Sequence, residues 1–354
     1  MKNSLCELLN LQYPIIQAPM AGVSTPELAA AVSNAGALGS ISIGAANPEQ
    51  AELMIQKTLA LSSGPVNVNV FCHQAVQRDE QLEKAWIKQF HELFVQYDAQ
   101  LPGELEEIYA TFHNNSLLLD ILLNIRPAAV SFHFGIPASV VINLLKQKGI
   151  ITLATATSID EAKEIEASGI DFIVAQGIEA GGHRGIFDPM QADSMLSTFT
   201  LVQAIKHHCR KPVIAAGGIM NGAGIAAMLA LGAEGAQLGT AFVLCPESSA
   251  NSAYREALKS KQAANTVLTS AISGRPARCI ENAFCTYARD FAKHTIPSYP
   301  LTYALGKALA SAAAAKGDHG FGAQWAGQGA QLAREMSAQD LVLTLVDEMH
   351  AARN

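Results

Sequence analysis

The chain has 354 residues, of which 49% are hydrophobic and 16% are charged, and its formal net charge is −7. This composition supplies a large apolar core and excludes a disordered or fibrous protein. The negative charge argues against nucleic acid or an anionic membrane as the main partner, because both bind basic surfaces.

The spacing of the cysteines and the length of the apolar stretches indicate the cellular compartment of the protein. The six cysteines are scattered and include no C-x-x-C pair, which indicates reduced thiols rather than disulfides or a metal site. No apolar stretch reaches the roughly 18 residues of a membrane span, and charges at Lys2 and Glu7 interrupt any secretory signal. We therefore expect a soluble, cytoplasmic protein with no bound metal and no membrane contact.

Short apolar, β-branched runs alternate with segments of helical period from the N-terminal region onward. Thr25 followed by Pro26 begins the first of these helices with a capping residue, and Ser158 with Glu161 begins a later one as a capping box. The candidate strands end in polar or glycine-rich turns and span residues 15–20, 38–42, 66–71, 128–134, 151–156, 172–176, 213–216 and 236–238.

Strands that are apolar throughout are buried on both faces. In a chain that alternates strands and helices this indicates a parallel sheet covered by helices. Eight such units close most economically as a (β/α)8 TIM barrel, which is an α/β fold. An open doubly wound sheet is the structural alternative.

Two regions break this rhythm. Residues 72–123 are too long for one crossover and contain Trp86, Phe90 and Phe94, which predicts a helical insertion after the third strand. Residues after 246 follow the eighth strand and have helical period, notably 303–315 and 338–351. We therefore predict a barrel over residues 1–246 and a mostly helical C-terminal extension over 247–354 that caps the active site.

Glycine-rich turns follow the last two predicted strands. The active site of such a barrel lies at the carboxyl ends of its strands, and its phosphate site is often built from these two loops. Gly217 and Gly218 follow the seventh strand, and Gly239 and Thr240 follow the eighth. Backbone without side chains can approach an anion closely. These glycines therefore favour a phosphate-binding role for the two turns over a role in reversing the chain alone.

Polar side chains stand at the ends of other strands. Asn67 and Asn69 share one face of the third strand, and Gln176 ends the sixth. Their amides either satisfy one another and the backbone or bind the pyrimidine edge of a flavin. His133 ends the fourth strand, and His183 lies in a glycine-rich loop after the sixth, where an imidazole would carry a proton or pair with an anionic substrate.

Motifs at these positions resemble those of the nitronate monooxygenases, formerly called 2-nitropropane dioxygenases. They are Q-A-P-M-A-G at 17–22, A-G-A-L-G at 35–39, E-A-G-G-H-R-G at 179–185 and A-A-G-G-I at 215–219. The resemblance runs from residue 13 to residue 240, and the loop at 179–185 is its most specific part. It implies an oxidoreductase with FMN bound non-covalently in a TIM barrel.

By this resemblance, His183 and His133 would be catalytic residues at the substrate site. Tyr299, Tyr303 and Lys307 resemble the aromatic-and-lysine set that the bacterial class I enzymes place over the flavin, and Tyr109 would join them from the insertion. Tyr303 and Lys307 are four residues apart, so a helix places them on one face. The residues implied to hold FMN are Met20, Ala21, Asn69, Gln176, Gly181, Gly182, Gly218, Gln237, Leu238, Gly239 and Thr240.

The implied reaction oxidises an alkyl nitronate, such as propionate 3-nitronate, with O2 to a carbonyl compound and a nitrogen oxide. We hypothesise one-electron transfer to FMN, through an anionic flavosemiquinone that O2 reoxidises. His183, His133 and Lys307 would attract the anionic substrate. Two alternatives stay open: an NAD(P)H-dependent FMN reductase of quinones or enoyl thioesters on the same barrel, and a non-redox barrel that binds a phosphate ligand through its glycine loops.

Overall fold

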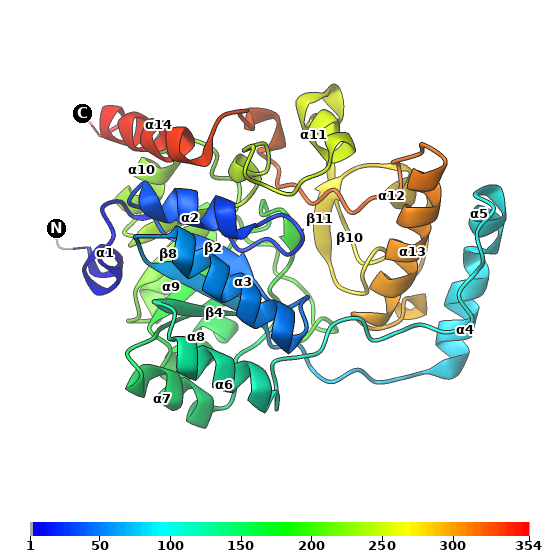
Figure 1. The fold of residues 1–354 in the computed structure, drawn as a ribbon, viewed down its shortest axis with the longest axis horizontal. Coiled ribbons are helices and arrows are strands. Elements are labelled where there is room, and N and C mark those ends of the chain that lie inside the picture. Colours follow the sequence, from blue (N-terminus) through cyan, green and yellow to red (C-terminus); the bar gives the residue numbers. More distant parts are fainter. Residues whose placement is uncertain (1–2, 354) are drawn as a thin grey trace.

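The computed structural model describes residues 3–353, within which eight parallel strands form a barrel surrounded by helices (Figure 1). Each strand pairs with its neighbours in chain order, and β9 pairs back with β1. A parallel bridge between Ile16 and Leu38 joins β1 to β2 and closes the ring. The barrel strands are β1 (Ile15–Gln17), β2 (Gly39–Ser42), β3 (Val66–Phe71), β4 (Ala129–His133), β5 (Ile151–Ala156), β6 (Phe172–Gln176), β8 (Val213–Ala216) and β9 (Gly235–Leu238).

This ring confirms the predicted TIM barrel and excludes the open sheet. The first strand ends at Gln17 rather than at residue 20, because Pro19 has no N–H group with which to continue the ladder. The predicted helix starts are also confirmed: Thr25 accepts a hydrogen bond from the Leu28 amide, and Ser158 accepts one from the Glu161 amide.

A helix packs outside each barrel strand, and the last of these helices comes from the far end of the chain. α14 (Ala338–Ala351) contacts α10 and α2 and adds Leu341, Leu345 and Met349 to the barrel core (Figure 1). The predicted division at residue 246 differs from this packing, since it assigns α14 to the extension. The other helices of the ring are α2 (Pro26–Asn34), α3 (Pro48–Leu61), α6 (Ser116–Ile125), α7 (Ser139–Gln147), α8 (Ile159–Ser168), α9 (Thr198–His208) and α10 (Gly222–Ala230).

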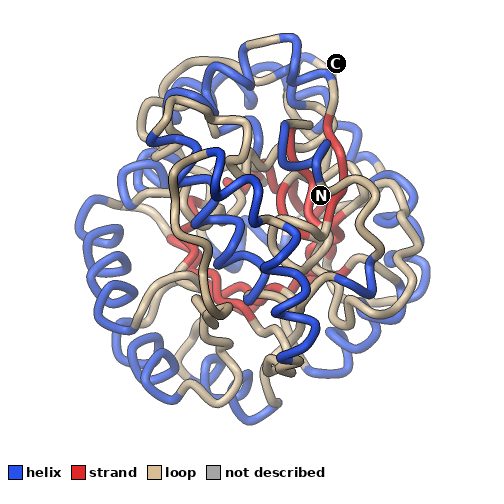
Figure 2. The backbone as a smooth tube through the Cα atoms, turned by 90° about the vertical axis from the view of Figure 1, so that its right-hand side faces the viewer, coloured by secondary structure: helices blue, strands red, loops and turns tan. Residues whose placement is uncertain are grey.

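The two ends of the barrel differ. α1 (Ser4–Leu9) packs Leu5 and Leu9 on the apolar side chains of the interior, near the start of β9. In Figure 2, helices and loops of the insertion and the extension stand in front of the strands, and further helices surround them. The barrel is therefore filled from one end and covered at the other.

The insertion and the extension share a hydrophobic cluster, called here the second core. Trp86 of α4 (Glu80–Gln89), Phe90 at the junction of the two helices and Phe94 of α5 (His91–Gln96) pack there with residues of α12 (Ala283–Tyr287) and α13 (Leu301–Ala315). Figure 1 shows these helices together, beside the barrel. The inserted part ends before α6, because Leu118 and Leu122 of that helix belong to the barrel core. The predicted insertion at 72–123 therefore extends into a barrel helix.

The extension also contains strands that the sequence did not predict. β10 (Thr266–Thr269) and β11 (Ala277–Ile280) form an antiparallel hairpin, and β11 pairs with β7 (Gly182–His183) from the loop after β6. Its remaining elements are α11 (Ser252–Lys259) and the short 3-10 helices η2 (Lys261–Ala264), η3 (Lys293–Thr295) and η4 (Ala330–Leu332), while η1 (Thr240–Phe242) directly follows β9. From residue 3 to residue 353, no helix combines the length and the apolarity that a bilayer crossing needs.

The second core generates a stability prediction. Phe90 is fully buried, with ring centroids of Trp86 and Tyr287 at 5.1 and 5.5 Å. Phe90→Ala should lower the free energy of unfolding, measured with urea, by about 3–5 kcal/mol, because it leaves a cavity among these rings. Val95→Ala on the exposed face of α5 is the control and should change it by less than about 0.5 kcal/mol. Equal effects of the two substitutions would contradict the shared second core.

Candidate active site

A cavity of about 720 Å3 lies at the carboxyl ends of the barrel strands. Its wall includes residues from the end of every barrel strand or from the loop that follows it. Apolar side chains such as Leu153 and Phe172 fill the barrel interior below the cavity. The cavity therefore lies where parallel barrels carry their active sites, and its size suits a cofactor together with a small substrate.

Every site residue predicted from the sequence lines this cavity except Leu238 and Asn67. The Leu238 side chain is fully buried in the barrel core, because Gln237 faces the cavity and successive residues of a strand face opposite sides. The residues brought together are Met20, Ala21, Asn69, Tyr109, His133, Gln176, Gly181, Gly182, His183, Gly218, Gln237, Gly239, Thr240, Tyr299, Tyr303 and Lys307.

Two glycine positions shape the wall beside β8 and β9. Gly218 has a φ of +70°, a conformation that favours glycine, so bare backbone lines the cavity there. At Gly181 a Cβ atom would lie 2.5 Å from the Gly327 nitrogen, so only glycine lets the extension approach this loop. The Gly327 amide then donates to Thr240 Oγ1 at 3.0 Å. The extension thus reaches the predicted phosphate loops.

His183 is held by the extension. His183 lies in β7, which pairs with β11 of the extension. Its Nε2 lies 2.9 Å from Ser273 Oγ, and the Ser273 hydroxyl donates to the Arg275 carbonyl. Since Ser273 has one hydroxyl hydrogen, we assign His183 Nε2 as the donor and Nδ1 as the unprotonated nitrogen. Burial, with smaller contributions from His133 and Arg275, lowers the pKa of His183 to about 3, so the imidazole is neutral near pH 7.

His133 is also neutral. Burial lowers its pKa to about 4, and the nearby arginines add to this effect. Its Nε2 lies 3.2 Å from the His183 carbonyl oxygen, which can only accept, so Nε2 carries the hydrogen. Nδ1, 3.1 Å from Thr155 Oγ1, is then the acceptor. His133 therefore supports the backbone that carries His183.

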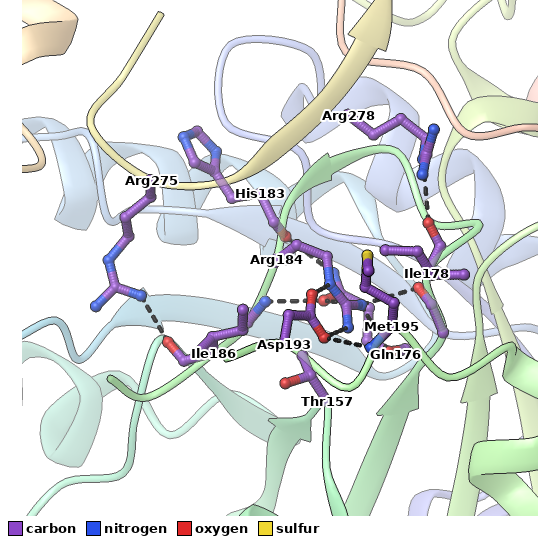
Figure 3. A network of polar contacts seen from close by, with 12 residues as sticks. Thr157, Gln176, Ile178, His183, Arg184, Ile186, Asp193, Met195, Arg275 and Arg278 are labelled. Atoms are coloured by element: carbon purple, nitrogen blue, oxygen red, sulfur yellow. Dashed lines mark hydrogen bonds and ion pairs between the residues drawn. The ribbon is translucent and has the colours of Figure 1, made fainter. Parts of the chain in front are cut away.

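The loop between β6 and α9 is held by a buried ion pair (Figure 3). Arg184, 1% exposed, donates from Nε and Nη2 to the two carboxylate oxygens of Asp193, at 2.8 and 3.0 Å. Its Nη1 donates to the backbone carbonyls of Gln176 and Gly177. Burial alone would raise the pKa of Asp193, but hydrogen bonds from Arg184 and from the Met195 amide hold it below its usual value.

The amides that the sequence singled out already have protein partners. Gln176 Nε2 donates to the His183 carbonyl at 2.9 Å, and its Oε1 accepts from the Gly185 amide at 2.8 Å. Asn69 Nδ2 donates to the carbonyl and hydroxyl of Ser131, and Asn67 Nδ2 donates to the same hydroxyl. These side chains fix the geometry of the cavity wall, and Gln176 Nε2 keeps one hydrogen for another acceptor.

Aromatic rings and one lysine form the wall opposite the barrel. Lys307 Nζ donates to Tyr109 Oη at 2.6 Å and lies 5.5 Å from the Tyr303 ring centroid, so Tyr303 and Lys307 share one face of α13. Tyr299 lies 5.5 Å from His183 between ring centroids. Burial raises the pKa of Tyr109 and of Tyr303 to about 12, so both phenols stay neutral beside the ammonium group.

Several residues of the site were missed by sequence reasoning. Trp325 lines the cavity with its ring centroid 5.0 Å from that of His183, and Phe134 lies 5.6 Å from His183. Phe134 stands beside His133 at a strand end and could have been proposed from that position. Trp325 and Ser273 carry no such signal, because the pairing of β11 with β7 brings them to the site from far along the chain.

Comparisons with known proteins agree with this geometry. A family model described as nitronate monooxygenase matches residues 2–348. A Paraburkholderia phytofirmans protein named nitronate monooxygenase is 52% identical over 98% of this chain and 95% of its own length, and one of the same name from Pseudomonas aeruginosa is 51% identical over 99% of both chains. The solved structure of a nitroalkane oxidase from Streptomyces ansochromogenes is 38% identical, with a TM-score of 0.90 over 99% of this chain and 98% of its own.

The buried ion pair generates a pH prediction. Asp193→Asn leaves Arg184 buried without its counter-charge and should lower the free energy of unfolding by about 3 kcal/mol at pH 7. The native pKa of Asp193 is depressed, so its contribution is present above the unfolded pKa of about 3.9 and is lost as pH falls through the lower native pKa.

Urea unfolding of the wild type and the variant at pH 7, 5 and 3 measures this difference, which should shrink below pH 4. Asp160→Asn is the matched control, because Asp160 is exposed and contacts only Lys163 at 3.8 Å within the described part of the chain. A difference for Asp193→Asn that is the same at every pH would rule out the charge as its source.

Proposed function

The chain belongs to the nitronate monooxygenase family, and from that premise we propose that it binds FMN and oxidises alkyl nitronates, such as propionate 3-nitronate, with O2 to a carbonyl compound and a nitrogen oxide. One observation carries the proposal: the bare-backbone loops after β8 and β9 open into the same cavity as His183, Lys307 and the tyrosines. An anion-binding floor and a substrate wall thus face one another.

The residues present fit a flavin mononucleotide. Gly218 and Gly239 offer backbone without side chains for a phosphate, and Thr240 stands at the start of η1. Met20, Asn69 and Gln176 line the cavity where a flavin ring would contact the barrel. FMN, when bound, supplies the electron acceptor for the substrate, and the protein supplies orientation and electrostatics.

The charge that attracts an anionic substrate comes from Lys307 rather than from the histidines. The sequence suggested that His183 and His133 would share this role, but both are neutral near pH 7 because they are buried. Lys307 forms no ion pair with any carboxylate between residues 3 and 353, and its Nζ lies between the rings of Tyr109 and Tyr303. A nitronate oxygen would pair with this ammonium group, which lines the cavity and is otherwise exposed.

His183 then serves as a neutral polar group. Its unprotonated Nδ1 has no hydrogen-bond partner among the described residues, and the side chain lines the cavity. A nitronate arrives already deprotonated, so the reaction does not require this nitrogen as a base; it can accept a hydrogen bond from a bound ligand instead. Ser273 and the rings of Trp325 and Tyr299 keep the imidazole in one orientation, so it presents a fixed polar surface to the cavity.

Replacing His183 tests its part in the reaction. His183→Asn should lower kcat/KM for nitronate by about 100-fold, since a small misplacement of the substrate costs about this much, while flavin content stays unchanged. Steady-state oxygen consumption and the flavin absorbance of the purified variant measure the two quantities. His207→Asn, on the exposed end of α9, is the matched control and should leave both unchanged. Full activity of His183→Asn would remove His183 from the mechanism.

Anaerobic mixing separates the proposal from its rivals. We expect nitronate to change the flavin spectrum within the turnover time and NADH to leave it unchanged. Rapid bleaching by NADH would instead identify a reductase of quinones or enoyl thioesters. A colourless protein that cannot be reconstituted with FMN would identify a non-redox phosphate-binding barrel.

A further inference from the structure

A second cavity, of about 280 Å3, lies behind the aromatic wall of the first. Its lining comes from the start of the insertion (73–77), the loop after β7 (188–190) and the extension. Tyr299 lines both cavities and is only 5% exposed, so its ring separates them. The proposed oxidation of nitronates uses none of the other residues of this second cavity.

The cavity contains a buried cation. Arg275 is 3% exposed, and among residues 3–353 no carboxylate forms an ion pair with it. Its Nη1 donates to the Ile186 carbonyl at 2.6 Å and its Nη2 to the Phe187 carbonyl at 3.3 Å, while the Phe134 ring covers one face of the guanidinium at 4.5 Å. Figure 3 shows the hydrogen bond from Arg275 to Ile186 and shows that Arg275 lies apart from the Arg184–Asp193 pair.

One edge of this guanidinium remains available. Arg275 Nε donates to no acceptor in the described part of the chain, yet it is not one of the fully buried unpartnered atoms, so it keeps access to solvent. The cavity that Arg275 lines is the second one. A guanidinium holds oxyanions through adjacent N–H groups. The carboxylates of Asp188 and Glu161 act on Arg275 only at a distance, without a direct ion pair, so a bound oxyanion would supply the close counter-charge that a buried cation favours.

The other lining residues suit a small anion. Lys293 adds a second positive charge at the rim, and Asp188 adds one negative charge. Gln74, Gln77, Ser270 and Ser298 supply uncharged polar groups. The cavity therefore has a net positive charge within a protein whose total charge is −7. Its size admits a small ligand.

We propose that this second cavity binds a small oxyanion, a carboxylate or a phosphate, on the free edge of Arg275. The occupant lies behind Tyr299, whose ring contacts His183 and Phe134 on the side of the first cavity. Binding there would restrain Tyr299, which forms part of the active-site wall. Tyr299 separates this site from the first cavity, so its occupant would not be the nitronate that is oxidised.

Isothermal titration tests the site with the full-length protein as purified, any flavin left in place. Inorganic phosphate and acetate are titrated separately, each against sodium chloride of equal ionic strength. We expect one of them to bind saturably with a Kd of about 5 mM or lower. The tighter ligand identifies the oxyanion class. Failure of both to saturate would overturn the proposal.

Variants then locate the binding. Arg275→Met should weaken it at least about tenfold, because it removes a charged donor. Arg278→Met is the matched control: it removes a buried arginine of the same segment whose Nε donates to the Ile178 carbonyl and which does not line the cavity, and binding should persist. Ala75→Trp fills the cavity from an exposed position while leaving Arg275 in place, and it should abolish binding even if Arg275→Met does not fold. Binding that survives Ala75→Trp would overturn the proposal.

Discussion

β7 and β11 join the barrel to its extension. Ala277 pairs with His183 and Arg278 with Gly182, so a two-residue strand in a barrel loop is held by a hairpin almost 100 residues further along the chain. The hydrogen bond from His183 to Ser273 and the contact with Trp325 both follow from this pairing. The barrel supplies the floor of the cavity, and the hairpin sets the position of the imidazole above it.

Buried arginines set the electrostatics around this junction. Arg184 has a carboxylate partner, whereas Arg275 and Arg278 donate to backbone carbonyls. The two histidines are already desolvated, and the charge of Arg275 further lowers the pKa of both, while that of Arg184 further lowers the pKa of His133. The same charge favours anions in the cavities nearby.

The sequence was informative wherever the signal is local. Strand ends, helix caps and glycine turns depend on neighbouring residues, and the barrel strands were predicted within a few residues for this reason. The placement of α14 was missed because its amphipathic pattern predicts a helix with one buried face but does not identify α10 and α2 as the helices it packs against. The hairpin of β10 and β11 was missed because its strands are short and include polar residues such as Arg278. Leu238 was carried over from the resemblance, although strand alternation at Gln237 would have placed it in the core.

The late return of α14 has a consequence for biosynthesis. The groove between α10 and α2 receives its apolar cover from α14, which follows every barrel strand in the chain. A nascent chain therefore exposes this groove after all the barrel strands have been made and until α14 has followed them. Synthesis of α14, rather than completion of the sheet, sets the moment at which the ring of helices becomes whole.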